Sequence, residues 1–282
     1  MAKIGLLLDS TTLTREEILK KPYVKAAPLS VTLDGHDYTE FEISLAEMSD
    51  KLHTSKKMTT SQPAPGEFFD RYKAFYEEGY EQVLVITLSE KISGTYQSAL
   101  IAKSMVDFPL EISVHASRVA SFGVALGIPI IMNMIEKEAA FDDIIAMTQK
   151  IYENAAVMFT LQDLMHLFRG GRLNKVSALL GTVLRIKPII EMIDGKLELT
   201  RKERTNNACF EYFMNTVQAY AEKYEVVYVD FIEMNRPEWV EKMVAETKAR
   251  FPKVIISTTH AVSPVFSVHL GDQGFGLAVV AL

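Results

Sequence analysis

Small hydroxyl residues and a glycine stand between an apolar run and a helix-like segment, an arrangement that can hold an anion. The apolar run at residues 83–88 passes into residues 89–98 (SEKISGTYQS). Backbone N–H groups at a helix N-terminus attract anions. The hydroxyls of Ser93 and Thr95 can donate hydrogen bonds, and Gly94 lets a ligand approach the backbone closely. The stretch therefore predicts a carboxylate or phosphate site, with ordinary helix capping as the competing interpretation.

Further polar groups stand where the chain is stiff or sharply turned. Thr60 and Ser61 belong to a Thr-Ser-Gln-Pro segment whose prolines restrict the backbone. Arg172 stands beside a Gly-Gly break, where a guanidinium can be aimed at a defined point. His269 lies in a glycine-rich stretch and is interpreted either as a core histidine or as a ligand of the same anion as Ser93. We expect these groups to converge.

Ser93, His269 and Asp9 also permit a second interpretation, a serine-dependent hydrolase of acyl or phosphoester substrates. The chain lacks the Gly-x-Ser-x-Gly elbow that presents a nucleophilic serine on a strained turn. It also offers no obvious general base poised on a leaving group. Binding is therefore favoured over catalysis, and no catalytic residue is predicted.

The composition argues against several other classes of protein. A net charge of −6 and the lack of zinc-finger, zipper or RNA-binding motifs disfavour nucleic-acid binding. The six histidines never stand at the paired spacing of a metal site, and the glycine motifs that cradle nucleotides are missing. The first apolar run is too short for a signal peptide, and no apolar stretch is long enough to span a bilayer. We expect a cytoplasmic protein without a metal or a cofactor.

The candidate residues follow runs typical of strands and precede runs typical of helices. This alternation predicts a mostly parallel sheet with helices on its faces, where ligands bind beyond the carboxyl ends of the strands. Asp34-Gly35 and Asp194-Gly195 predict hairpin turns, Ser44 to Glu47 predicts a capping box, and a loop is predicted through Pro264. Strands are predicted at 3–8, 83–88, 110–114, 157–161, 226–232 and 277–281, and helices at 66–78, 95–106, 123–135, 139–154, 164–173, 176–184, 205–223 and 236–250.

Two α/β domains are predicted, residues 1–156 and 157–282, with a ligand between and within them. The first has the mostly parallel sheet, and the second contains a β-hairpin. Residues 169–204 carry nine Lys or Arg against four Asp or Glu, which gathers positive charge where an anionic ligand or an acidic partner would use it.

In order and spacing, a set of short motifs resembles the DegV family, the fatty-acid-binding proteins that serve as the FakB subunit of bacterial fatty acid kinase. The resemblance runs over nearly the whole chain. The motifs are Asp9-Ser-Thr11, Thr60-Ser-Gln-Pro63, Ser93-Gly-Thr-Tyr-Gln-Ser-Ala99, Arg169-Gly-Gly-Arg172, Ile186-Lys-Pro-Ile189, Asp194-Gly195 and His269-Leu-Gly271.

The resemblance implies a protein that buries a long-chain fatty acid in a tunnel and holds its carboxylate between two domains. A separate kinase subunit, FakA, would supply the ATP site and phosphorylate the carboxylate for phospholipid synthesis, so this chain would not itself be an enzyme. Arg204 falls where the family meets its kinase, and transient membrane contact would allow ligand exchange. The carboxylate contacts that the resemblance implies are Thr60, Ser61, Ser93, Gly94, Arg172 and His269.

The chain departs from the family pattern at two places. Ala116-Ser117 stands where the family commonly has Asp-Ser, which removes a carboxylate. His269-Leu-Gly-Asp-Gln-Gly replaces the common His-x-Gly-Pro-Gly, which adds the carboxylate of Asp272. This carboxylate is expected either to raise the pKa of His269 or to face solvent.

Overall fold

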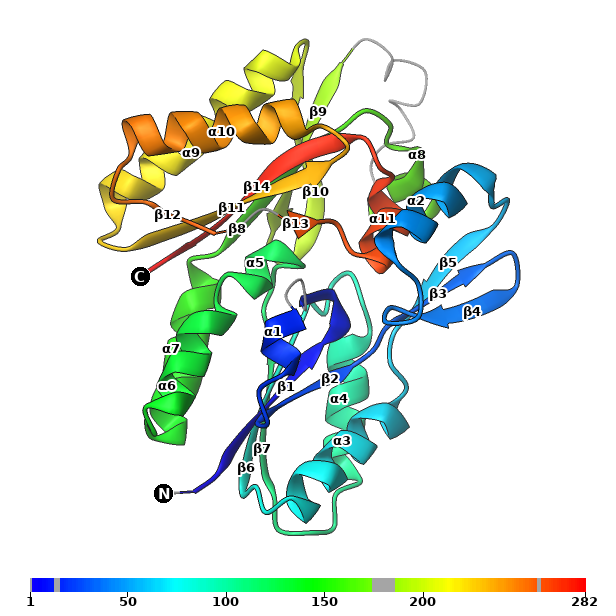
Figure 1. Ribbon diagram of the computed structural model, residues 1–282, viewed down its shortest axis with the longest axis vertical. Helices are drawn as coiled ribbons and strands as arrows, with labels where there is room; N and C mark the ends of the chain where they lie inside the picture. Colours follow the sequence, from blue (N-terminus) through cyan, green and yellow to red (C-terminus); the bar gives the residue numbers. More distant parts are fainter. Residues whose placement is uncertain (1, 13–15, 174–185, 258–259) are drawn as a thin grey trace.

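Three β-sheets organise the residues that the computed structural model describes, which are 2–12, 16–173, 186–257 and 260–282 (Figure 1). The first, the parallel sheet, has the strand order β2-β1-β6-β7, and each neighbouring pair runs parallel. The carboxyl ends of these strands therefore meet at one edge, as the alternating pattern predicts. The strands are β1 (Ile4–Asp9), β2 (Val24–Ala27), β6 (Gln82–Thr87) and β7 (Glu111–Ala116).

Helices cover both faces of the parallel sheet, which explains why its strands are continuous apolar runs. Successive strand residues point to opposite faces, so Leu7 packs with α3 (Pro65–Glu77) and α4 (Thr95–Ser104). Leu6 and Leu8 belong to the core cluster on the other face. The helices that contribute to that cluster include α5 (Phe122–Ala125), α6 (Ile128–Glu136) and α7 (Phe141–Glu153). The short η1 (Ser10–Thr12) and α1 (Glu16–Leu19) follow β1.

The large sheet is mixed and has the order β10-β9-β8-β14-β11-β12, with β13 also paired to β11. Its central strand β14 is buried along its whole length and runs antiparallel to both neighbours. Helices α9 (Asn206–Lys223) and α10 (Pro237–Arg250) pack on one face. The strands are β8 (Ala156–Leu161), β9 (Lys187–Ile193), β10 (Lys196–Glu203), β11 (Val227–Met234), β12 (Ile255–Ile256), β13 (His260–Ala261) and β14 (Gly274–Ala281).

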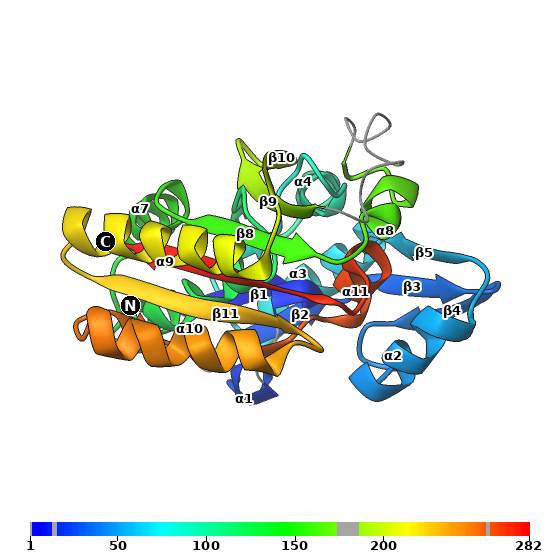
Figure 2. The same cartoon turned by 90° about the horizontal axis from the view of Figure 1, so that it is seen from above.

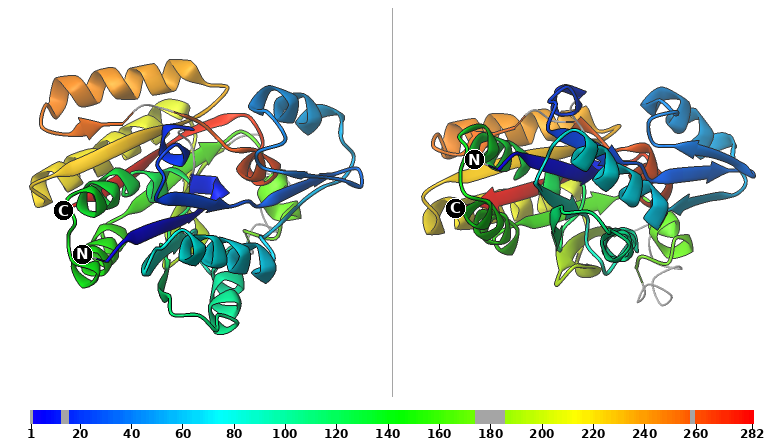
Figure 3. Two further views of the ribbon diagram at one scale, coloured as in Figure 1. Left: turned by 60° about the horizontal axis from the view of Figure 1, so that its bottom comes forward. Right: turned by 90° about the horizontal axis from the view of Figure 1, so that it is seen from below.

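The small sheet, β4-β3-β5, projects at the end of the molecule away from α9 and α10 (Figure 2). Both chain termini lie on the opposite side from it (Figure 3). Val31 and Met48 of this region pack with Val265 and Val268 of α11 (Pro264–Leu270). The remaining elements are β3 (Ser30–Leu33), β4 (His36–Thr39), β5 (Met58–Ser61), α2 (Leu45–Thr54) and α8 (Met165–Arg169).

Local sequence signals account for the turns and caps. Asp34 and Gly35 join β3 to β4 with positive φ angles of 49° and 89°, and Asp194 and Gly195 do the same between β9 and β10 at 47° and 82°. Such φ angles favour Asn, Asp and Gly. The antiparallel pairing of β3 with β4 and of β9 with β10 confirms both predicted hairpins. The predicted capping box is also confirmed: Ser44 Oγ accepts from the Glu47 backbone N–H, and the Glu47 carboxylate accepts from the Ser44 backbone N–H.

Two predicted elements differ from the structure, and a third lies outside the described residues. The loop predicted through Pro264 is the helix α11, since proline is tolerated in the first turn of a helix and Gly271, at φ 74°, forms its end. The apolar stretch 123–135 forms two helices, α5 and α6, with Pro129 in the first turn of the second. The helix predicted at 176–184 lies outside the described residues.

The largest core cluster draws on both halves of the chain, from Leu6 in the parallel sheet to Val280 in the large sheet. The division into residues 1–156 and 157–282 therefore stays a prediction. Within the described ranges, no helix combines the length and the apolar character needed to cross a membrane.

Candidate functional site

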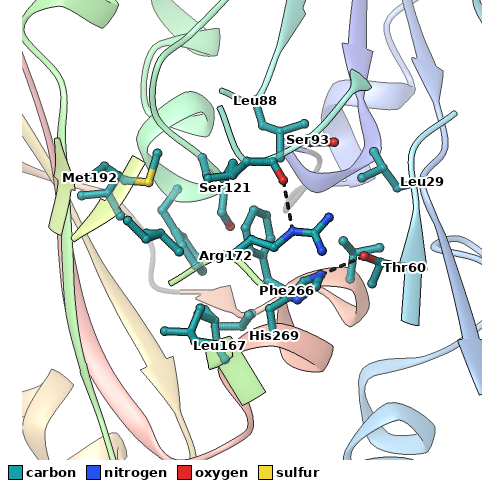
Figure 4. A pocket seen from close by; sticks show the side chains of 18 of the residues that line it. Leu29, Thr60, Leu88, Ser93, Ser121, Leu167, Arg172, Met192, Phe266 and His269 are labelled. Atoms are coloured by element: carbon teal, nitrogen blue, oxygen red, sulfur yellow. Dashed lines mark hydrogen bonds between the residues drawn. The ribbon is translucent and has the colours of Figure 1, made fainter. Parts of the chain in front are cut away.

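A cavity of about 380 Å³ lies between the parallel sheet and the large sheet (Figure 4). Its volume is in the range of small-molecule sites. Most of its wall is apolar and comes from segments far apart in the chain. The apolar lining includes Leu29, Leu88, Ile92, Phe122, Val157, Phe159, Leu167, Met192, Leu197, Ile232, Val265 and Phe266.

Polar side chains gather in one part of this lining. Thr60 and Ser61 come from the end of β5, and Ser93 comes from the loop that follows β6. Arg172 follows α8 and His269 lies on α11. The structure therefore brings these five candidate residues to the wall of one cavity from four places in the fold.

His269 and Thr60 form the best-defined polar contact of the group. His269 Nε2 and Thr60 Oγ1 share a hydrogen bond of 2.8 Å, while the buried His269 Nδ1 has no hydrogen-bond partner among the described residues. Gly170 lies against the ring so closely that a Cβ there would overlap Nδ1. Burial, with the charges of Arg172 and His166, lowers the pKa of His269 to about 4. The imidazole is therefore neutral at pH 7.

Arg172 supplies positive charge beside the neutral histidine (Figure 4). Its Nε donates to the carbonyl of Ile92 at 3.2 Å, and its Nη1 donates to the carbonyl of Gly170 at 2.6 Å. These two bonds hold the half-buried guanidinium in place, and no carboxylate among the described residues pairs with it. A fixed guanidinium without an acidic partner is suited to bind an anionic ligand.

The Ser93 loop packs directly against the Thr60 segment. A Cβ at Gly94 would overlap the side-chain amide of Gln62, and Gln62 Nε2 donates to Ser98 Oγ at 3.3 Å. Ser93 Oγ shares a hydrogen bond of 2.9 Å with Thr95 Oγ1. Gly94 thus permits the close approach of two segments, a role that the sequence motif alone does not distinguish from ligand contact.

Ser121 is a polar residue of the lining that the sequence-based list of contacts omits. It stands before α5 with φ 49° and ψ −117°, and its buried hydroxyl has no partner among the described residues. The backbone conformation is strained for a residue other than glycine, and such strain is frequent at ligand sites. In the sequence this residue stands only in a Ser121-Phe-Gly123 pattern, which gives no indication of an unpaired hydroxyl.

A second buried polar cluster lies behind the site and joins β1 to α11. Asp9 accepts from the backbone N–H groups of Thr11 at 3.0 Å and Leu88 at 2.6 Å, which confirms that the ends of β1 and β6 share one edge. Glu40 accepts from Ser10 Oγ, from Ser263 Oγ at 2.5 Å and from the Val265 backbone N–H at 3.1 Å.

The hydrogen bonds of this cluster differ from those of a catalytic triad. Asp9 bonds within its own loop and to Leu88, and His269 bonds to Thr60. Burial raises the pKa of Asp9 to about 6 and that of Glu40 to about 7. In the described part of the chain, Ser93, His269 and Asp9 are not linked by the hydrogen bonds that a serine nucleophile requires.

Two further expectations can be compared with the structure. The carboxylate of Asp272 accepts hydrogen bonds from His53 Nε2 at 2.8 Å and from the side-chain amide of Asn235 at 3.3 Å. The pKa of His269 is lowered, so the expectation that Asp272 raises it is wrong. Arg204 is exposed after β10 and is not among the residues that line the cavity.

Comparisons with known proteins give a consistent result over the whole chain. The sequence model of the family described as "Uncharacterised protein, DegV family" matches residues 3–282. A DegV domain-containing protein of Halalkalibacterium halodurans is 35% identical over 280 residues, which covers 99% of this chain and 98% of that protein.

Solved structures agree with the sequence match. A DegV family protein of Thermus thermophilus, described by its fatty acid binding, has a TM-score of 0.91 at 28% identity, with complete coverage of both chains. A stearic-acid-binding protein of Eubacterium ventriosum has a TM-score of 0.83 at 27% identity and covers 100% of this chain and 98% of its own. The predicted mixed α/β fold is confirmed by these likenesses.

Proposed function

Because the chain belongs to the DegV family, we propose that it binds a long-chain fatty acid and presents the carboxylate to a fatty acid kinase. The observation that carries the proposal is a cavity whose wall is mostly apolar and whose polar groups include Arg172 and His269. An acyl chain gains free energy by leaving water along the apolar wall, while its carboxylate needs a fixed donor set.

The donor set suits a carboxylate better than a neutral head group. Arg172 has no acidic partner in the described chain, so a bound carboxylate would form the ion pair that the protein leaves open. Thr60 and Ser93 offer hydroxyl donors. The Ser121 hydroxyl, which has no partner among the described residues, adds a further donor in the same lining. Hydrogen bonds to a charged group are worth about 1.5–3 kcal/mol each.

The proposed reaction takes place at this carboxylate and is catalysed by the partner. A carboxylate oxygen attacks the γ-phosphorus of a nucleoside triphosphate held by the kinase, and a new O–P bond forms. The bond from that phosphorus to the bridging oxygen breaks, and its electron pair leaves with the diphosphate. The fatty acid becomes an acyl phosphate, and this chain holds the substrate before the step and the product after it.

Ligand identification tests the binding half of the proposal. Protein purified from bacteria, denatured and extracted, is expected to release a long-chain fatty acid at about one per chain when analysed by mass spectrometry. Met192→Trp should block loading because the larger side chain fills the cavity, whereas Met105→Trp, at an exposed position, should not. A protein that carries no acyl chain and takes up no added fatty acid would contradict the proposal.

Charge reversal at Arg204 tests the contact with the kinase. With the kinase subunit and ATP present, Arg204→Glu is expected to abolish acyl phosphate formation while the fatty acid still binds. Arg250→Glu, which reverses an exposed charge on α10, is the matched control. Normal acyl phosphate formation by Arg204→Glu would remove Arg204 from the contact.

A further inference from the structure

A second cavity, here named the basic groove, adjoins the polar part of the acyl cavity and has a volume of about 390 Å³. Its walls come from the segment that leads into β5, from the end of α8 and from α11. Thr60, Arg172 and His269 line both cavities. The hydrogen-bonded pair of Thr60 and His269, together with Arg172, therefore stands between the acyl cavity and the basic groove.

The basic groove is lined by positive charge. Lys56, Lys57, Arg169 and Arg172 contribute four cationic side chains, His166 adds an imidazole, and its lining contains no Asp or Glu. Within the described ranges, none of the four cations takes part in an ion pair. Like charges gathered in a hollow repel one another, so an anion that enters the groove relieves this repulsion.

The backbone that carries the two lysines is fixed without use of their ammonium groups. The carboxylate of Asp34 accepts from the backbone N–H groups of Lys56 at 3.0 Å and Lys57 at 2.8 Å. In return, the Asp34 backbone N–H donates to the Lys57 carbonyl at 2.9 Å. Both lysine side chains are exposed and face the groove, so they stay available to a ligand.

The charge of the groove exceeds what a carboxylate requires. A fatty acid carboxylate carries one negative charge, and Arg172 in the shared wall can neutralise it. Conversion to an acyl phosphate places a phosphoryl group with two negative charges beyond the carboxyl carbon, on the side away from the acyl chain. Three further cations, Lys56, Lys57 and Arg169, lie on that side of Thr60 and His269.

We propose that the basic groove is a phosphoryl subsite, in which Lys56, Lys57 and Arg169 bind the phosphoryl group of an acyl phosphate whose chain fills the acyl cavity. This inference rests on the proposed function, because the acyl phosphate is the product of the proposed kinase step. The subsite holds the product after transfer and keeps its phosphoryl group in a fixed position.

A stable analogue separates the subsite from the carboxylate site. The probe is a β-ketophosphonate, in which a methylene replaces the bridging oxygen of the acyl phosphate, compared with the fatty acid of the same chain length. In Lys56→Gln/Lys57→Gln, affinity for the phosphonate is expected to fall at least tenfold, while affinity for the fatty acid stays within twofold. Lys248→Gln/Lys253→Gln removes two exposed charges elsewhere and is expected to change neither affinity.

Each other outcome has a definite meaning. Wild-type protein that binds the fatty acid but not the phosphonate, or a groove variant that loses neither ligand, overturns the subsite alone. If affinity for the phosphonate and for the fatty acid falls equally, the lysines bind the carboxylate, which also overturns the phosphoryl subsite. Wild-type protein that binds no fatty acid overturns the proposed function and, with it, this inference.

Membrane docking is the alternative use of such a groove and can be tested with the same variants. The probe is vesicles of phosphatidylglycerol and phosphatidylcholine in equal parts. Binding to these vesicles is expected to be the same for Lys56→Gln/Lys57→Gln and for Lys248→Gln/Lys253→Gln. A loss of vesicle binding specific to the groove variant, with phosphonate affinity unchanged, would assign the basic groove to a lipid surface and overturn the subsite.

Discussion

Two buried polar clusters lie close together in this protein and differ in how completely the chain satisfies them. The cluster of Asp9, Ser10 and Glu40 finds donors in its own loop, at Leu88 and at the start of α11. The cluster at the cavity leaves Ser121 Oγ and His269 Nδ1 without partners among the described residues.

This difference distinguishes residues that stabilise the fold from residues that are available to bind a ligand. Buried polar groups are normally paired, because an unpaired one costs about 1–3 kcal/mol. A fully paired cluster is therefore expected to contribute to folding. A cluster that has an unpaired hydroxyl and a guanidinium without an acidic partner among the described residues is expected to contribute to binding.

Glu40→Ala should have the largest effect on stability. The change leaves the hydroxyls of Ser10 and Ser263 and the Val265 N–H without their acceptor. We expect the free energy of unfolding in urea to fall by about 4 kcal/mol, the combined cost of a cavity and unpaired buried donors. Glu241→Ala, at an exposed position on α10, should change it by less than about 0.5 kcal/mol. A small effect at Glu40 would mean that the paired cluster does not support the fold.

The pH dependence of stability should follow the buried carboxyl of Glu40. Its folded pKa of about 7 exceeds the ordinary 4.5, so the folded state binds the proton more tightly than the unfolded state between these values. Its contribution to the unfolding free energy is present below pH 4.5 and is lost as pH rises through 7. The loss is on the order of 3 kcal/mol.

Glu40→Gln isolates this contribution from other titrating groups. His269 acts in the opposite direction, because its folded pKa of about 4 is lower than 6.5 and its contribution is lost as pH falls. From pH 4.5 to 8, the unfolding free energy of the wild type should fall relative to that of Glu40→Gln, because glutamine does not titrate. A difference that is constant with pH would show that Glu40 titrates normally.

Arg172→Met tests the open side of the comparison. It removes the cation of the cavity wall, and we expect affinity for a long-chain fatty acid to fall about tenfold to a hundredfold, the loss of a charged hydrogen bond. Arg172→Lys, which keeps the charge, should bind with intermediate affinity. Isothermal titration of both variants, with Arg250→Met as control, gives the ratio. Unchanged affinity in Arg172→Met would place the carboxylate elsewhere.

Ser121→Ala should have the smallest effect and the most specific one. The hydroxyl has no partner in the described chain, so its removal should leave the unfolding free energy within about 0.5 kcal/mol. Fatty acid affinity should fall by about 1 kcal/mol, roughly fivefold, if the hydroxyl donates to the ligand. A clear loss of stability with no loss of affinity would reverse the assignment of this residue.

Much of the fold could be predicted because its signals are local. The Asp34-Gly35 turn, the Ser44 capping box and the apolar run of β1 each lie within a few residues of the chain. The helix α11 was missed because the glycines at 271, 274 and 276 suggested a loop, although Pro264 suits a first helical turn.

The site could be predicted only as far as residue types and motif order allow. The motifs identify Thr60, Ser93, Arg172 and His269, and the structure places all four in the lining of one cavity. The unpaired state of Ser121 could not be predicted, because it depends on which groups the fold brings near. The hydrogen-bond partner of Asp272 also could not be predicted, since His53 lies 219 residues away in sequence.

The most direct test of the account is the carboxyl NMR signal of a bound fatty acid labelled with ¹³C at its carboxyl carbon. We predict one bound signal per chain, and we predict that this carboxyl stays ionised to a lower pH than in free solution because Arg172 stabilises its charge. In Arg172→Met the titration should move to higher pH. The absence of a bound signal, or a carboxyl that titrates identically in wild type and Arg172→Met, would contradict the account.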